Sequence, residues 1–392
     1  MVGRLPVLAW VLVGGAALAA QDGAAATRPQ REVAFESAWR EVAAGFRRAC
    51  QEAGVVGASL WFVRGAHVHG FATHGLADRA RGRVVDADTI FHWASCTKTL
   101  TGVAVLQLRD RGRLRLDQPI VELVPELRAV HDPFAKIGAV TIRHLLSHSG
   151  GFRPSTWPWG GKAWHPHEPT RWEQLVAMMP YTELEFVPGT RYSYSNPGIV
   201  FLGRAIETLT GEDYEVYMEK NVLRPLGMHR SYFDSTPYHL QRHRSHSYGV
   251  RDGTVVDHGP EFDTGITVSN GGLNAPLGDM ARYVSFLLGA VEPGSDAAGV
   301  LARASVAEMG EPAVPTDPSG RNHMGLTLFV QEVGGQRFLT HTGGQRDFVS
   351  FFYLHMASGT GALGAFNTGT AGPVMARVRA RCMQELSLPL AR

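Results

Sequence analysis

The chain has 392 residues, of which 44% are hydrophobic and 19% are charged. This balance is typical of a globular protein with a sizeable core. The formal net charge is only +2, so the composition gives no reason to expect nucleic acid or an anionic membrane as a partner. Three cysteines are too few for a scaffold held together by disulfide bonds.

The first segment is predicted to be a secretory signal. Arg4 precedes an apolar run over 5–20 that ends in small residues suited to cleavage. An uncleaved membrane anchor is the alternative, but the run is short for a bilayer span. We therefore expect residues 1–20 to be a signal peptide and 21–31 a linker. The mature protein is then expected to be secreted or periplasmic, with no stable membrane anchor after cleavage.

The rest of the chain, 32–392, is predicted to form a single domain. It begins with a helix that ends near Gly54, because apolar residues recur there at three- and four-residue spacing. Two strands follow, at 57–63 and 68–74, separated by a short hairpin-like break. The apolar positions of the helix are Phe35, Trp39, Val42, Phe46, Ala49 and Cys50.

A β-rich block is predicted near the other end, followed by a helix that begins near Pro373, since proline suits a first helical position. Helices and strands at both ends indicate one sheet, built from about 32–75 and 324–392. The segment of about 95–310, which reads as mostly helical, is inserted between them. The predicted C-terminal strands are 324–333, 336–342, 348–356 and 361–367. If both terminal helices pack on one face of the sheet, Cys50 and Cys382 approach each other. The sequence leaves open whether they form a disulfide.

Ser95 stands just before a strongly apolar stretch that ends at Gly112. A helix that is apolar on nearly every side is buried. A serine at its start lies where backbone N–H groups and the helix dipole favour developing negative charge. Lys98, three residues later, falls on the same helix face and can reach the serine oxygen. Burial should lower the pKa of this lysine, so the pair meets the requirements for an activated nucleophile with an adjacent base.

The choice of lysine at this position is informative. Of the 38 Lys and Arg residues only four are Lys, namely Lys98, Lys136, Lys162 and Lys220. Arginine does not lose its proton in a protein, whereas a lysine does when burial lowers its pKa. Among the four, Lys98 alone has a serine three positions before it. The alternative is a surface lysine beside an unrelated serine.

Two further segments are candidates for substrate binding. Asn196 suits a helix N-cap and Pro197 the first helical position, so Tyr194 and Asn196 are expected in a loop at a helix start. His341-Thr342-Gly343-Gly344 ends a predicted strand, where glycines allow a ligand backbone to approach closely. Taken alone, each segment has a structural alternative: a cap with a packed tyrosine, and a buried structural histidine among 17.

Taken together, Ser95–Lys98, Tyr194–Asn196 and His341–Gly344 resemble the motifs of the serine β-lactamase and penicillin-binding-protein family. The similarity is to its branch of class C β-lactamases, DD-carboxypeptidases and related esterases, and it covers roughly 35–370. Further segments that look like landmarks of this family are Phe91–Ala94, Leu145–Gly151, Pro188–Gly189, Pro225–Met228 and Gly271–Leu273 with Asp279.

The resemblance implies an α/β fold: an antiparallel sheet flanked by N- and C-terminal helices, a mostly helical insertion, and an active site between them. Ser95 would be the acylated nucleophile, Lys98 its base or proton relay, and Tyr194 would share the proton transfer to the leaving group. The expected substrate is a small acyl compound, with no cofactor and no metal. Asn196, His341, Thr342 and Gly343 would bind and orient it, and the backbone N–H groups of Ser95 and Gly344 would form the oxyanion hole.

Three departures from the family pattern bear on the substrate. Many β-lactamases have lysine where this chain has His341, whereas histidine occurs in some DD-peptidases and esterases. No glutamate motif of the class A deacylation type is present. Gln345–Asp347 follows the strand glycines where relatives often have small residues. We therefore expect an exported serine hydrolase of DD-carboxypeptidase or esterase type, with a true β-lactamase as the alternative.

Two other classes of protein fit the sequence less well. A metalloenzyme would need a third ligand and a carboxylate in recognisable spacing, and none accompanies the histidines. A non-catalytic penicillin-binding sensor is disfavoured because the nucleophile, base, tyrosine and strand motif are all intact. The histidines considered are His165, His167, His239, His243 and His246. A loop with Trp157, Trp159 and Trp164 is either an aromatic rim that selects the acyl group or ordinary packing.

Overall fold

The computed structural model describes residues 28–134, 137–156, 169–291 and 294–391, and the statements below concern these residues. The predicted signal peptide and the tryptophan-rich loop of 157–164 lie outside them, as do His165 and His167. Within the described ranges, no helix combines the length and the hydropathy needed to span a membrane.

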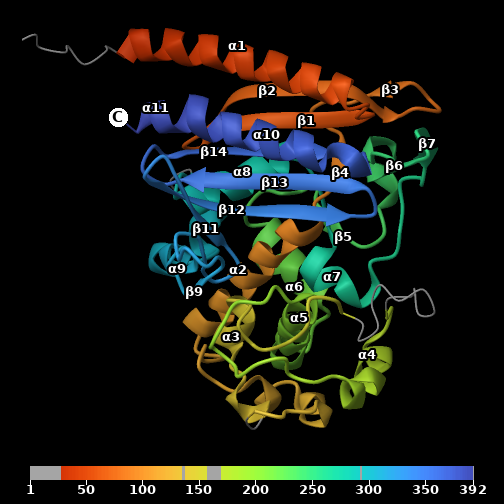
Figure 1. The fold of residues 1–392 in the computed structure, drawn as a ribbon, viewed down its shortest axis with the longest axis vertical. Helices are drawn as coiled ribbons and strands as arrows, with labels where there is room; N and C mark the ends of the chain where they lie inside the picture. The colour runs from red at the N-terminus through yellow and green to blue at the C-terminus, as the bar shows by residue number, and fades with distance from the viewer. Residues whose placement is uncertain (1–27, 135–136, 157–168, 292–293, 392) are drawn as a thin grey trace, which may run out of the picture.

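Strands from both ends of the chain form one antiparallel sheet, with nine strands among the described residues (Figure 1). β1 (Gly57–Arg64) pairs with β14 (Thr360–Phe366), which joins the N-terminal hairpin to the C-terminal strands. The prediction of one sheet built from both termini is therefore confirmed. The strands in spatial order are β3 (Arg83–Val84), β2 (His67–Asp78), β1, β14, β13 (Phe348–His355), β12 (Gln336–Gln345), β11 (Phe329–Val333), β10 (His323–Met324) and β9 (Val314–Pro315).

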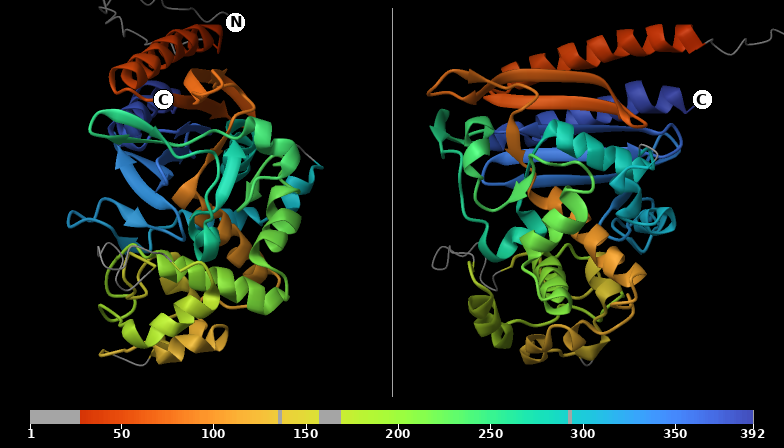
Figure 2. Two further views of the ribbon diagram at one scale, coloured as in Figure 1. Left: turned by 90° about the vertical axis from the view of Figure 1, so that its right-hand side faces the viewer. Right: turned by 180° about the vertical axis from the view of Figure 1, so that it is seen from behind.

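The two faces of the sheet bury different cores. Phe351 and Tyr353 of β13 pack with the terminal helices, whereas Phe352 and Leu354 belong to the core shared with the helical segment. This alternation follows from the two-residue period of a strand. The terminal helices α1 (Arg28–Glu52) and α10 (Gly372–Arg381) lie side by side on the outer face (Figure 1). Most of the helical segment extends from the inner face of the sheet toward the opposite end of the molecule (Figure 2), whereas α8 (Leu277–Leu288) packs directly against β1, β13 and β14.

The terminal helices differ from the prediction mainly at their ends. α1 begins at Arg28, so residues 28–31 are helical rather than part of the predicted linker. The C-terminal helix continues beyond α10 as a π-helical turn, Cys382–Ser387, and the short α11 (Leu388–Leu390). Val374, Val378 and Cys382 of this helix are all buried. Cys50 and Cys382 lie in the same core, and all three thiols of the chain are free.

The predicted strand 324–333 is wrong as a single strand. It is interrupted between β10 and β11, where Thr327 has a φ of 64° and its N–H donates to the carbonyl of Leu146. The hydrophobic pattern of the sequence does not reveal this break, because the residues between β10 and β11 are still buried against the helical segment. β12, in contrast, runs three residues beyond its predicted end at 342 and includes both glycines of the His341–Gly344 motif.

The middle of the chain is mostly helical, as expected, but it also contains short strands that the sequence analysis missed. Strands of two to four residues show no usable periodicity, so pattern analysis does not detect them. The helices here are α2 (Thr97–Asp110), α3 (Ile142–Leu146), α4 (Trp172–Met178), α5 (Asn196–Thr210), α6 (Tyr214–Met218), α7 (Val268–Gly271), α8 (Leu277–Leu288) and α9 (Arg303–Met309). The missed strands are β4 (Ile90–His92), β5 (Tyr232–Phe233), β6 (Tyr248–Arg251), β7 (Thr254–Asp257) and β8 (Leu273–Pro276).

Thiol counting tests the state of the cysteines. Burial raises the pKa of Cys50, Cys96 and Cys382 to about 12, so the folded protein should react slowly with thiol reagents. After unfolding without reductant, we expect three reactive thiols per chain. A count of one would show that Cys50 and Cys382 are bonded to each other.

Candidate active site

Ser95 lies at the junction of the sheet and the helical segment. It belongs to a short 3₁₀ turn, Ala94–Cys96, that leads directly into α2, so the predicted position at the start of a buried helix is correct. Ala94 has a φ of 47°, a region that L-residues adopt rarely and that often marks a functional turn. Thr97 stabilises this turn: its hydroxyl donates to the carbonyl of Ala94 at 2.6 Å and accepts the N–H of Leu273 at 3.0 Å.

Lys98 is fully buried in the first turn of α2, with 0% of its surface exposed. Its Nζ lies 3.0 Å from Ser95 Oγ and donates to the backbone carbonyl of Asn270 at 2.7 Å. Burial lowers the pKa of Lys98 to about 7, and no carboxylate among the described residues pairs with it. A large fraction of this amine is therefore neutral at physiological pH. In that state Nζ accepts the Ser95 proton while still donating to Asn270.

Tyr194 closes the other side of the nucleophile. Burial raises the pKa of its phenol well above the usual range, and a hydrogen bond with Ser95 offsets part of the rise. Lys98 Nζ lies 5.0 Å from the centre of the tyrosine ring. The structure therefore brings Ser95, Lys98 and Tyr194 together, as the sequence analysis predicted. A phenol that stays protonated can pass a proton to a leaving group but is a poor resident base.

The predicted N-cap of α5 is wrong by one residue. Ser195 is the cap, since its Oγ accepts the N–H of Gly198 at 3.2 Å, and Asn196 is the first helical residue. Serine caps a helix as well as asparagine does, so residue type alone does not distinguish the two. The Asn196 side chain is therefore not used to cap the helix, and its Oδ1 is buried without a hydrogen-bond partner among the described residues.

His341 of β12 faces the same site. It is 1% exposed, and burial, followed by the charge of Lys98, lowers its pKa to about 3. Its Nδ1 lies 2.7 Å from the carbonyl oxygen of Thr342, so Nδ1 carries the proton and Nε2 presents a lone pair. Nε2 is buried and has no hydrogen-bond partner in the part of the chain that the structure describes. The position that is lysine in many β-lactamases therefore holds a neutral acceptor here.

The glycines of β12 have different roles. A Cβ at Gly343 would come within 2.2 Å of the carbonyl oxygen of Trp93, so glycine is required for β12 to pack beneath the Ser95 turn. A Cβ at Gly344 would meet no protein atom within 4 Å. β11 pairs with β12 only as far as Thr340, so the edge of 341–345 on that side is unpaired. An extended acyl group can therefore align along this edge.

Sequence reasoning missed two contributors. The carbonyl of Asn270 binds Lys98, and a backbone carbonyl leaves no signature in a sequence. His148 packs against Tyr194 with ring centroids 4.5 Å apart. It lies in the Leu145–Gly151 segment, which resembles a landmark of the family but gives no sign that His148 contacts Tyr194.

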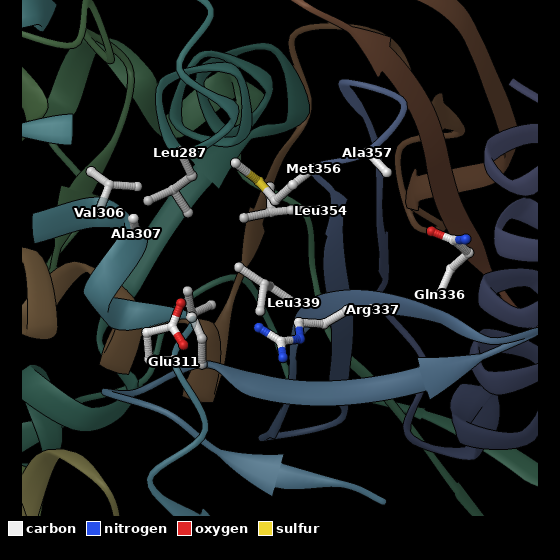
Figure 3. A pocket seen from close by; sticks show the side chains of 12 residues that line it. Leu287, Val306, Ala307, Glu311, Gln336, Arg337, Leu339, Leu354, Met356 and Ala357 are labelled. Carbon is white, nitrogen blue, oxygen red and sulfur yellow. The ribbon is translucent and has the colours of Figure 1, made fainter. Parts of the chain in front are cut away.

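A separate apolar cavity of about 450 Å³ opens near the start of β12, away from Ser95 (Figure 3). Leu287, Val306, Leu339 and Leu354 contribute to its walls, with Arg337 among the lining residues. None of the predicted site residues lines it. Among the described residues, no group of three or more His, Cys, Asp or Glu side chains is placed to hold a metal ion.

Lys98→Arg tests the base. Arginine keeps the charge but does not accept the Ser95 proton, so acylation should fall by about 10³-fold. In the wild type, kcat/KM should rise with pH through about 7, because Lys98 must be neutral to act. Lys220→Arg is the matched control, since Lys220 is an exposed residue paired with Glu212. Near-normal acylation by Lys98→Arg would contradict the assigned role.

Gly343→Ala and Gly344→Ala separate packing from substrate binding. Gly343→Ala should destabilise the fold by about 1–3 kcal/mol because of overpacking against Trp93. Gly344→Ala should leave the thermal unfolding midpoint nearly unchanged but lower kcat/KM, since its methyl group enters open space beside the strand edge. Equal stability losses in the two variants would contradict this reading.

Comparisons with known proteins agree with this architecture. The Beta-lactamase family model matches residues 37–381. Esterase EstB of Burkholderia gladioli is 31% identical over 212 residues, which is 50% of this chain and 53% of the esterase. Protein flp of Staphylococcus aureus (strain MW2) is 27% identical over 238 residues, 61% of this chain and 46% of that protein. The chain thus spans about half the length of these curated relatives.

Solved structures give the same picture. The octameric penicillin-binding protein homologue from Pyrococcus abyssi superposes with a TM-score of 0.75 at 25% identity, covering 90% of this chain and 79% of that chain. A class C beta-lactamase also has a TM-score of 0.75, at 19% identity, covering 90% and 97%; at this identity the likeness concerns the fold alone. With the family model matching most of its length, this chain belongs to the beta-lactamase family.

Proposed function

We propose that the protein is a serine hydrolase that cleaves carboxylic esters through an acyl-enzyme on Ser95. The observation that carries this proposal is the contact between Ser95 Oγ and a buried Lys98 that has no carboxylate partner among the described residues. Such a lysine is available as a base near neutral pH, which is the condition for activating a serine.

In the acylation step, neutral Lys98 takes the proton of Ser95 as Oγ attacks the carbonyl carbon. The tetrahedral intermediate collapses with loss of the alkoxide, which receives a proton relayed through the Tyr194 hydroxyl. Acylation thus forms the Ser95 ester and releases the alcohol. Water then attacks the acyl carbon and gives up a proton to the same basic groups. The second tetrahedral intermediate breaks its bond to Ser95 Oγ, which takes up that proton, so the carboxylic acid is released and the Ser95 hydroxyl is regenerated.

Charge on the carbonyl oxygen needs stabilisation in both steps. The backbone N–H groups of Ser95 and Gly344 are the proposed donors, since β12 packs against the Ser95 turn. Loss of one such donor typically costs about 3–4 kcal/mol in the transition state. Thr342 and Asn196 complete the proposed binding surface, and the side-chain Oδ1 of Asn196 has no hydrogen-bond partner among the described residues.

A neutral His341 favours an ester as the substrate over a peptide that carries a free carboxylate. An unpartnered lone pair at Nε2 offers no attraction to a negative charge, and the similarity to Esterase EstB points in the same direction. A D-alanyl peptide is the second candidate, favoured by the unpaired edge of β12 at 341–345. A β-lactam would acylate Ser95 by the same chemistry, and the rate of deacylation would distinguish a β-lactamase from the other two.

The test is a substrate panel read by rapid kinetics and mass spectrometry. With p-nitrophenyl butyrate we expect a burst of nitrophenol and a butyryl adduct on Ser95. Turnover of D-Ala-D-Ala peptide or of a chromogenic cephalosporin should be slower. Ser95→Ala should lose at least about 10⁴-fold in kcat with its fold intact. If no probe of the panel modifies Ser95, the proposal is wrong; if peptide turnover exceeds ester turnover, the second candidate replaces the first.

A further inference from the structure

His148 has an unusual backbone conformation beside the site. It follows α3 in a loop and has a φ of 53°, although it is not glycine. Residues held in this region are strained and persist only where the surrounding structure holds them. His148 is also 1% exposed, so the strained residue is part of the interior.

His148 forms hydrogen bonds with the residues on both sides of Tyr194 in the sequence. Its carbonyl accepts the N–H of Ser193 at 2.8 Å, and its Nδ1 accepts the N–H of Ser195 at 3.2 Å. Between these two bonds, its ring packs against the Tyr194 ring with centroids 4.5 Å apart and planes 36° apart. The side chain and the backbone of His148 thus hold the Tyr194 ring and the residues on both sides of it.

These contacts also determine the protonation state of the His148 ring. Because Nδ1 accepts a hydrogen bond from a backbone N–H, the proton of the neutral ring lies on Nε2. Burial, then the charges of Lys98 and His341, keeps the pKa of His148 well below its usual value. A protonated ring would lose the bond to Ser195. Nε2 is buried and has no partner among the described residues, so only one of the two ring nitrogens is used in hydrogen bonding to the surrounding protein.

We propose that His148 is a positioning residue for Tyr194, holding the phenol against Ser95 through the ring contact and the bonds to Ser193 and Ser195. The inference rests on the proposed function, because positioning matters only if Tyr194 relays the proton. His148 itself touches no reacting atom in this scheme. The strain at its backbone is offset by contacts that place the Tyr194 hydroxyl beside the nucleophile.

The alternative is that His148 only stabilises the loop. His144 offers a matched comparison in the same segment, since its Nδ1 also accepts a backbone N–H, that of Thr141 at 3.3 Å. No ring contact joins His144 to Tyr194 in the described structure. A histidine that acts through stability alone should therefore behave as His144 does when it is replaced.

A double-mutant cycle separates the two explanations. The variants are His148→Phe, which keeps a ring, and His148→Asn, which keeps an acceptor and tolerates a positive φ. Each is made with Tyr194 intact and with Tyr194→Phe, and His144→Phe is the control. The acylation rate is measured with p-nitrophenyl butyrate, and labelling of Ser95 with a fluorophosphonate probe.

If His148 acts through Tyr194, His148→Phe should slow acylation by about 10–100-fold with little change in KM. The same change should cost less than about 2-fold once the phenol hydroxyl is absent. His148→Asn should lose less than His148→Phe, and His144→Phe should acylate normally even if its thermal midpoint falls.

Equal losses with and without the Tyr194 hydroxyl would overturn the proposal, as would normal acylation by both His148 variants. If His148→Phe does not fold, the His148→Asn cycle decides by the same criterion. Failure of the proposed function gives a different result: wild-type Ser95 would be modified by neither the ester nor the fluorophosphonate, and the positioning role would be overturned with it.

Discussion

The site depends on one buried amine that has no counter-ion among the described residues. Lys98 is enclosed by the core of α2, and a side-chain hydroxyl and a backbone carbonyl are its hydrogen-bond partners. A carboxylate in place of either would stabilise the ammonium and remove the base. Desolvation without a countercharge has the opposite effect, and the pKa of Lys98 falls to about 7. The proposed reactivity of Ser95 therefore depends on the absence of a charged partner for the lysine as much as on the groups that contact it.

The same principle extends to the neighbouring histidines. Burial and the nearby lysine keep both His148 and His341 neutral. In each ring a backbone group occupies Nδ1, while Nε2 remains buried and unpartnered. Buried polar atoms without partners are uncommon in folded proteins, and here two of them flank Tyr194.

The fold supplies the junction at which these groups meet. β12 can lie beneath the Ser95 turn because Gly343 has no side chain, and its free edge begins where β11 ends at Thr340. α2, the loop before α5, and α7 then bring Lys98, Tyr194 and the Asn270 carbonyl to Ser95 from three separate parts of the helical segment. The sheet contributes the strand edge, and the helical segment contributes the groups that are proposed to move protons.

The sequence by itself determined the local features. The buried helix after Ser95, the terminal helices and the strand at His341 could all be predicted, because each depends on residue types at fixed short spacing. The three motifs and their order also identified the family. Serine three residues before lysine on one helix face is a local geometric fact, so this part of the site needed no tertiary information.

Only the tertiary structure decided the rest. It placed the helix cap at Ser195 rather than Asn196, divided the predicted strand at Thr327, and left Cys50 and Cys382 as free thiols in one core. It also brought the Asn270 carbonyl to Lys98 and folded His148 around Tyr194. No periodicity or compositional bias in the sequence indicates where backbone carbonyls, strained dihedral angles or contacts between distant segments will occur. They depend on contacts between residues far apart in the chain, which exist only once the chain has folded.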